Sequence, residues 1–155
     1  MTLDSDVAAP VESAWAPLPG CGAVRVGQVA PPRRVVVSDD GLARMRTAIQ
    51  SVIADVVQVG IADVCADPLV FALTAGLPRL TGFDKSIDGG SAWRDEAPIV
   101  PGQLYAVSEI AEVAERRTSG GQRMVRVAYL TTFTDQHGQS VGSATGTSVH
   151  LGAGT

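Results

Sequence analysis

Long segments of alternating apolar and polar residues, in the second half of the chain, constrain its fold most. Residues 103–117 (QLYAVSEIAEVAERR) alternate with a period of two, and residues 123–134 (RMVRVAYLTTFT) do the same. This is the period of a β-strand, whose successive side chains point to opposite faces. Two further strands are expected at residues 91–99 and 140–151, with turns at 101–102, 118–122 and 135–139. The pattern predicts a meander of antiparallel strands.

Helical signals precede this meander. At residues 40–58, apolar residues recur at spacings of three and four, which marks one face of a helix, and residues 38–40 (SDD) supply N-cap oxygens. A second helix is expected at residues 68–77 (PLVFALTAGL); it is apolar nearly all round, so it should be buried. A short strand at residues 33–38 comes before both helices. We therefore expect an α+β domain in which a bent antiparallel sheet wraps around a central apolar helix.

Composition and charge limit the partners that the chain can have. It has 155 residues, which fits one domain, and a net charge of −4, which argues against a nucleic-acid partner. No apolar run approaches the roughly 18 residues of a membrane span, and the first residues lack the features of a secretory signal. Residues 1–22 are expected to form a flexible tail before a domain at residues 23–151. We expect a cytoplasmic protein that binds neither nucleic acid nor membrane.

Three short motifs lie in the region of the expected meander. Gly89 and Gly90 precede Trp93, so that two glycines stand just before an aromatic residue. Residues 98–102 read PIVPG, and residues 134–138 read TDQHG. In this order the motifs resemble the N-terminal hot-dog domain of MaoC-like dehydratases, and in particular its FAS1-like branch. The family's versions are a Gly-Gly-x-x-aromatic strand, the string (R)P(I/L)xxGD and a turn of the type TNQDG.

The resemblance covers about residues 26–150, with Gln103 where the family usually has Asp. It implies a single hot-dog fold, similar to the non-catalytic subunits of heterodimeric (3R)-hydroxyacyl-ACP/CoA dehydratases. Such a subunit acts on an acyl-CoA or acyl-ACP together with a homologous catalytic hot-dog partner, in fatty-acid or polyketide metabolism. A heterodimer or a homodimer is therefore expected, with no cofactor and no metal ion.

Active members of that family carry an Asp and a His, five positions apart, in a loop that reads G-D-x-N-P-(I/L)-H. The closest string in this chain is residues 64–70 (VCADPLV). Aligned on Pro68, Cys65 takes the place of the Asp and Val70 that of the His. A second alignment puts residues 66–71 (ADPLVF) at the start of the central helix and removes most of the loop. Both alignments leave no general base, so no catalytic residue is assigned.

The two histidines lie elsewhere. Asp135 and His137 form either an acid–base pair or part of a hairpin turn, and the turn residues around them favour the turn. His150 stands at the end of the last expected strand, where a catalytic role is not expected.

Two other enzymatic readings remain open. Cys65 is either a nucleophile at a helix N-terminus or an inert buried thiol. Asp63 and Asp67 are either carboxylate bases, as in hot-dog thioesterases, or helix caps. A stand-alone thioesterase or polyketide-tailoring enzyme is the alternative function, and a non-enzymatic acyl-binding module is a third.

The sequence also offers candidate residues for binding the acyl group and the phosphates of its carrier. The glycine pair and Trp93 either line an acyl channel or serve sheet packing. The predicted substrate-binding residues are Asp67, Leu69, Val70, Phe71, Gly89, Gly90 and Trp93. Five arginines are either contacts to the phosphates of CoA or pantetheine or scattered surface residues: Arg33, Arg34, Arg116, Arg117 and Arg123.

Overall fold

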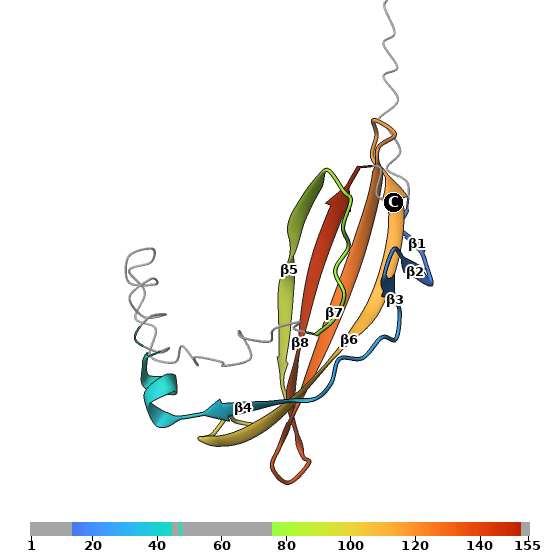
Figure 1. Cartoon of the computed structure of the whole chain (residues 1–155). Coiled ribbons are helices and arrows are strands. Elements are labelled where there is room, and N and C mark those ends of the chain that lie inside the picture. The colour runs from blue at the N-terminus through green and yellow to red at the C-terminus, as the bar shows by residue number, and fades with distance from the viewer. Residues whose placement is uncertain (1–13, 45–46, 48–75, 153–155) are drawn as a thin grey trace, which may run out of the picture.

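One antiparallel sheet dominates the computed structural model, which describes residues 14–44, 47 and 76–152 (Figure 1). Its strands follow the order β1-β6-β7-β8-β5, and β4 also pairs with β6. These strands are β1 (Ala16–Pro17), β4 (Arg33–Val37), β5 (Lys85–Asp95), β6 (Gly102–Arg117), β7 (Arg123–Asp135) and β8 (Ser140–Leu151). A separate pair is formed by β2 (Gly20–Cys21) and β3 (Val24–Arg25).

The long meander is confirmed. β6, β7 and β8 coincide, within one residue at each end, with the strands predicted from alternation. β6 and β7 pair from Leu104↔Asp135 to Arg117↔Arg123, and the turn at residues 118–122 joins them. A bulge between Ile110 and Glu112 interrupts this ladder. A bulge bends its strand and increases the local twist, in keeping with the curvature of β6 in Figure 1.

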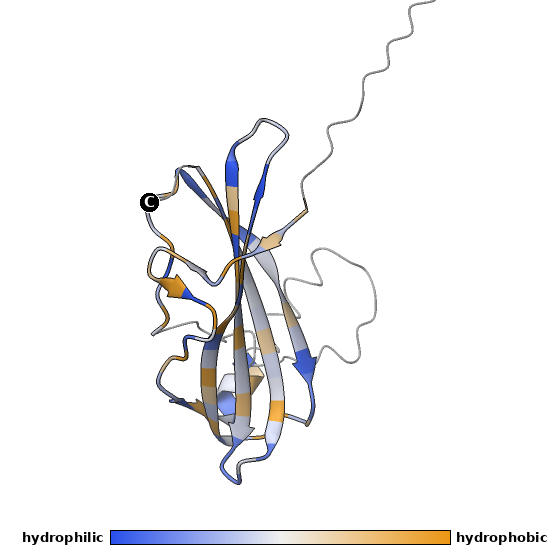
Figure 2. Ribbon diagram, turned by 90° about the vertical axis from the view of Figure 1, so that its right-hand side faces the viewer, coloured by the Kyte–Doolittle hydropathy of each residue, from blue (hydrophilic) through white to orange (hydrophobic). Residues whose placement is uncertain are grey.

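One face of the sheet carries the core. Figure 2 shows apolar residues recurring along the long strands. At one end of this face, residues from β6 and β7 pack against the segment before β5 and against the small pair of strands: Cys21, Val24, Ala30, Leu77, Leu80, Ile110, Val113, Val125, Val127 and Tyr129. A second cluster covers the other end: Val37, Leu42, Leu104, Ala106, Phe133, Val141 and Ala144. We call this side of the sheet the core face.

The start of β5 differs from the prediction. The strand begins at Lys85 rather than at residue 91, and the glycine pair lies inside it. The pairing of β5 with β8 shifts between Asp88 and Gly90, so Gly89 is the extra residue of a bulge. Gly90 has a φ of 97°, and its N–H donates to Asp88 Oδ1 at 2.9 Å. Glycine weakens a regular strand, so the predicted strand began only after the pair, but at this bulge the positive φ of Gly90 favours glycine.

Part of the expected N-terminal tail is ordered on the sheet. Ala16 of β1 pairs with Glu115 of β6, and β2 lies next to β3. The Trp15 ring lies beside two guanidinium groups, with centroid distances of 4.8 Å to Arg116 Cζ and 4.5 Å to Arg126 Cζ. Strand pairing and cation–π contacts therefore hold the chain to the sheet from Trp15 onward, within the segment that was expected to be a tail.

Helix is a small part of the described structure. Residues 39–44 are helical, and Ser38 caps them: its Oγ accepts a hydrogen bond from the Gly41 N–H at 3.1 Å. This confirms the predicted beginning of the helix at 40–58, whose later part lies largely outside the described residues. The predicted central helix at 68–77 also lies there, up to residue 75, so it stays a prediction. No helix in the described part of the chain is long and apolar enough to cross a membrane.

Candidate functional site

A cavity of about 310 Å³ opens on the core face near the outer edge of the sheet. This volume lies at the lower end of the range that is typical of small-molecule sites. The segment before β5 and strands β5, β7 and β8 line it. Its lining combines apolar surface with polar groups and is formed by Arg79, Ser86, Ile87, Asp88, Tyr129, Gly146, Thr147 and Ser148.

The bulge at Gly89 decides which side chains of β5 face this cavity. Asp88 pairs with Ser148 of β8, and Trp93 pairs with Ala144. Directly opposed residues share a face of the sheet, and Ser148 and Ala144 are an even number of positions apart. Asp88 and Trp93 are an odd number apart, so a regular strand would put them on opposite faces. The extra residue Gly89 brings both onto the core face.

Glycine is required at the bulge for a steric reason. A Cβ added at Gly89 would lie 2.9 Å from the methyl carbon of Thr147, a lining residue on β8. The backbone of β5 therefore approaches β8 more closely than a side chain would allow. The predicted site residues Gly89, Gly90 and Trp93 all lie on the strand that forms one wall of the cavity. Trp93 is 48% exposed.

His150 stands next to the cavity without lining it. Its Nε2 and the Ser148 Oγ share a hydrogen bond of 3.0 Å, and its ring packs against Phe83 with centroids 5.5 Å apart. The residue is only 6% exposed. Burial lowers the pKa of His150, and the positive charge of Arg79 lowers it further. Both effects favour the neutral imidazole, and its hydrogen bond connects it to Ser148 in the cavity lining.

The charged groups of the cavity come from separate segments. The Arg79 Cζ lies 5.9 Å from the centroid of the Tyr129 ring, which places a cation above an aromatic face. Asp88 supplies a carboxylate to the same lining, and its Oδ1 is already hydrogen-bonded to the Gly90 N–H. The hydroxyl groups of Ser86 and Ser148 can donate to or accept from a polar ligand group. The arrangement suits binding of a partly polar small molecule.

The other predicted site residues lie outside the described residues: Asp67, Leu69, Val70 and Phe71, together with Asp63 and Cys65. Their contribution to the site stays a prediction.

The Asp135–His137 pair belongs to a turn. Asp135 Oδ1 accepts hydrogen bonds from the backbone N–H groups of His137, at 2.8 Å, and Gln139, at 2.9 Å. Gly138 takes a φ of 78°, as a tight hairpin turn requires. The pKa of Asp135 is lowered, chiefly by the bond from Gln139. The carboxylate thus organises the backbone between β7 and β8, which confirms the interpretation as a turn.

Several residues of the cavity were not predicted from the sequence. Arg79, Ser86, Asp88 and Ser148 come from three segments that only the folded sheet brings together. Two local features of the sequence could have indicated some of them: Asp88 directly precedes the glycine pair, and Ser148 lies two positions before His150 in an expected strand. The described residues hold no group of three or more His, Cys, Asp or Glu side chains that could bind a metal ion.

The five arginines separate into two groups. Arg33 and Arg34 lie on β4, which pairs with β6 at Ala106 and Tyr105. The remaining three, Arg116, Arg117 and Arg123, gather at the opposite end of the β6–β7 hairpin. They are therefore not scattered.

No protein-family model matches this chain, and a search of curated proteins likewise finds no match.

Proposed function

We propose that this chain is a hot-dog subunit of a MaoC-like (3R)-hydroxyacyl-CoA or -ACP dehydratase. In this proposal the antiparallel sheet is that of a hot-dog domain, and the apolar sequence at residues 68–77 supplies the central helix. The chain shapes the acyl-binding site, while a homologous subunit supplies the catalytic Asp and His. The observation that carries the proposal is the cavity beside the Gly89 bulge, where Asp88 and Trp93 share the core face of β5.

The groups around the cavity favour binding over catalysis. Dehydration of a 3-hydroxyacyl thioester removes a proton from C2 and the hydroxyl from C3, so it needs a base and an acid. Among the residues that the structure describes, the cavity lining offers one carboxylate, Asp88, and no imidazole. His150 is buried behind Ser148, and His137 lies in the exposed turn. A partner that carries both groups would complete the chemistry.

The outer edge of β5 supports the presence of such a partner. β5 is the last strand in the sheet order, and all of its residues are exposed. Ile87 is 50% exposed and Trp93 48%. An edge strand presents unpaired N–H and C=O groups, which can pair with a strand from another chain. A second hot-dog subunit at this edge would pair with these groups and extend the sheet.

The direct test compares the purified chain with a co-expressed complex. The second subunit should be a hot-dog protein from the same genome that carries the G-D-x-N-P-x-H sequence. The assay measures hydration of a trans-2-enoyl-CoA through the loss of its enoyl absorbance. We expect this activity for the complex and not for the chain alone. Robust turnover by the pure chain, or failure of the two subunits to co-purify, would contradict the proposal.

Variants in the active complex test the roles of Trp93 and Asp88. Trp93→Ala should raise KM for a long acyl chain by about fivefold or more, through lost apolar contact. Val36→Ala, which removes an exposed apolar side chain from β4, is the matched control and should leave KM unchanged. Asp88→Asn should change kcat little. A loss of more than about a hundredfold would instead identify Asp88 as the acid or base.

A further inference from the structure

A serine and a histidine of β8 form a hydrogen-bonded pair that the dehydration reaction does not use. Ser148 Oγ and His150 Nε2 are 3.0 Å apart. The two residues are two positions apart in the strand, so both side chains lie on the core face. Ser148 lines the cavity of about 310 Å³ beside β5. A hydroxyl group that is hydrogen-bonded to an imidazole is the arrangement in which a histidine activates a serine as a nucleophile.

The surroundings of His150 hold its ring in place and favour the form that can act as a base. The ring packs against Phe83 with centroids 5.5 Å apart, and the residue is buried. The residues opposite it in the sheet, Ser86 of β5 and Val125 of β7, carry no charge. Burial, and then the charge of Arg79, lowers the pKa of His150. A lowered pKa favours the neutral imidazole, which can take a proton from a hydroxyl group.

Open space lies next to Ser148 on the core face. Gly146 is two positions before Ser148 and also lines the cavity. A Cβ added at Gly146 would meet no atom of the described residues within 4 Å. Tyr129 of β7 pairs with Gly146 and forms another part of the lining. The described residues thus leave room for the carbonyl group of a ligand beside the Ser148 hydroxyl group.

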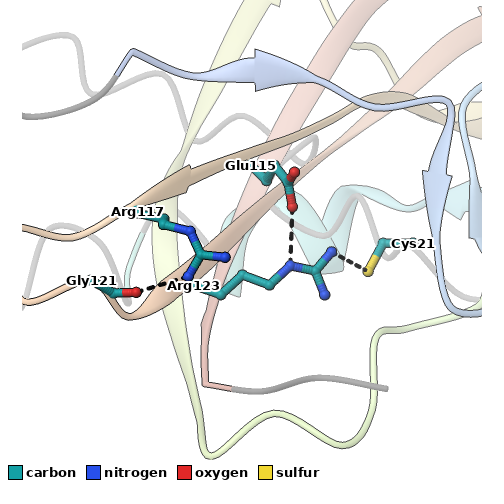
Figure 3. A network of polar contacts seen from close by, with 5 residues as sticks. All are labelled: Cys21, Glu115, Arg117, Gly121 and Arg123. Carbon is teal, nitrogen blue, oxygen red and sulfur yellow. Dashed lines mark hydrogen bonds and ion pairs between the residues drawn. The ribbon is translucent and has the colours of Figure 1, made fainter.

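A second candidate nucleophile, Cys21, has a cation as its partner. Cys21 is a buried free cysteine. Its Sγ lies 3.8 Å from Nη2 of Arg123, and the Nε of the same guanidinium donates to Glu115 Oε2 at 3.0 Å (Figure 3). A guanidinium has no acceptor, so Arg123 cannot take up a proton from the thiol. Ser148 differs from Cys21 because its partner is an imidazole, which can take up a proton.

We propose that Ser148 is a nucleophile for the hydrolysis of an ester and that His150 is its general base. The Ser148 oxygen attacks the carbonyl carbon of the ester, and the hydroxyl proton passes to His150 Nε2. The bond from that carbon to the alcohol oxygen then breaks, and the alcohol leaves with the proton, so that the acyl group stays on Ser148. Water attacks this acyl-serine and gives one proton to His150, which returns it to the Ser148 oxygen as that oxygen leaves. The net reaction converts one ester and one water into a carboxylic acid and an alcohol.

The cavity limits the size and charge of the acyl group. A volume of about 310 Å³ lies at the lower end of the range of small-molecule sites, which favours a short acyl group. Asp88 lies directly opposite Ser148 on β5, and its carboxylate disfavours an acyl group that carries a negative charge. We therefore expect short, uncharged acyl esters as substrates.

This inference goes beyond the proposed function and does not rest on it. The dehydration requires a partner subunit, whereas ester hydrolysis uses two residues of β8. Hydratase activity is expected only for the complex, and ester hydrolysis is expected for the pure chain. Failure of one activity would therefore leave the other prediction unchanged.

The test measures hydrolysis of p-nitrophenyl acetate by the purified full chain. Ser148→Ala should lower kcat/KM by about a hundredfold or more, because it removes the nucleophile. His150→Gln should lower it by about a hundredfold, because a glutamine side chain accepts the hydrogen bond from Ser148 but cannot take up the proton. Ser143→Ala is the matched control: Ser143 is also half-buried on β8, but it pairs with Thr132 and lies outside the cavity lining. It should leave kcat/KM within about twofold.

Covalent labelling of the parent chain identifies the nucleophile without a variant. A fluorophosphonate reacts with an activated serine hydroxyl group and releases fluoride, and mass measurement of the peptides should place the adduct on Ser148. The labelling rate should rise with pH and level off, with a midpoint below about pH 6.5, because the pKa of His150 is lowered from that value. Ser143→Ala should be labelled at the parent rate, and His150→Gln about a hundredfold more slowly.

Unfolding temperatures of the three variants are measured beside the rates, so that loss of activity is separated from loss of folding. An adduct on another residue, or no adduct on Ser148, would overturn the proposal. Ester hydrolysis that a folded Ser148→Ala variant leaves unchanged would overturn it as well.

Discussion

Ser108 of β6 and Thr131 of β7 lie directly opposite each other in the core, and their hydroxyl oxygens are 2.7 Å apart. Ser108 is 5% exposed and Thr131 1%, so each hydroxyl depends on the other for its hydrogen bond. Thr131→Val should lower the free energy of unfolding by about 1–3 kcal/mol, because it leaves the Ser108 hydroxyl buried and unpaired. Urea denaturation measures this change.

The double variant Ser108→Ala/Thr131→Val is the control for that pair. It removes both hydroxyls, so no polar group is left without a partner, and it should recover most of the stability lost in Thr131→Val. If the losses of the two single variants simply added in the double variant, the hydrogen bond would not be what stabilises this position.

The conformation of the bulge in β5 predicts that Gly90→Ala lowers stability more than Gly120→Ala does. Gly90 has a φ of 97°, so Gly90→Ala should cost about 1–2 kcal/mol of stability through backbone strain. An added Cβ at Gly120, in the turn between β6 and β7, meets nothing nearer than Thr118 Oγ1 at 3.8 Å. Gly120→Ala should therefore be close to neutral. Equal unfolding midpoints for the two variants would argue against the left-handed conformation at Gly90.

Burial of His150 makes stability depend on pH. Its pKa is lowered in the folded protein, first by burial and then by Arg79, whereas in the unfolded chain it is near 6.5. Below about pH 6.5 the unfolded chain takes up a proton that the folded protein does not, so stability falls as pH drops toward the folded pKa. His150→Gln should lose less stability than the wild type between about pH 7.5 and pH 5.5. Urea unfolding midpoints of both proteins across that pH range measure the difference. If the two midpoints changed equally with pH, the buried His150 would not be the source of the pH dependence.

The turn at residues 135–139 gives a prediction that separates the roles of Asp135 and His137. Asp135→Ala removes the acceptor for two backbone N–H groups, so it should lower the unfolding temperature measurably. His137→Ala should leave that temperature nearly unchanged, because the bond from His137 uses its backbone N–H. A larger drop for His137→Ala than for Asp135→Ala would show that the imidazole, and not the carboxylate, stabilises the turn.

The sequence predicted the parts of the fold that depend on local pattern. Period-two alternation located β6 and β7, and the capping residue Ser38 located the start of the helix. The start of β5 could not be read in the same way, because the bulge at Gly89 depends on Thr147, which is far away in the sequence. Local rules treat two glycines as the end of a strand, and only the partner strand determines whether they form a bulge.

The candidate site was predictable in part, for a similar reason. The glycine pair and Trp93 were identified from their motif; they lie on β5, but the residues of β5 that line the cavity are Ser86, Ile87 and Asp88. Arg79 was not identified, because it reaches the cavity from a segment outside the sheet. His150 was judged only by its position at a strand end, and its burial depends on Phe83, which packs over it.

The bulge at Gly89 also limits which chains can add to the outer edge of β5. An exposed edge can promote uncontrolled growth of a sheet from one molecule to the next. Here an incoming regular strand that aligns with residues 90–95 falls out of register at residues 85–88, because β5 contains one extra residue between them. The edge thus discriminates against generic strands, including those that cause aggregation, and admits only a chain with a matching irregularity or a short one.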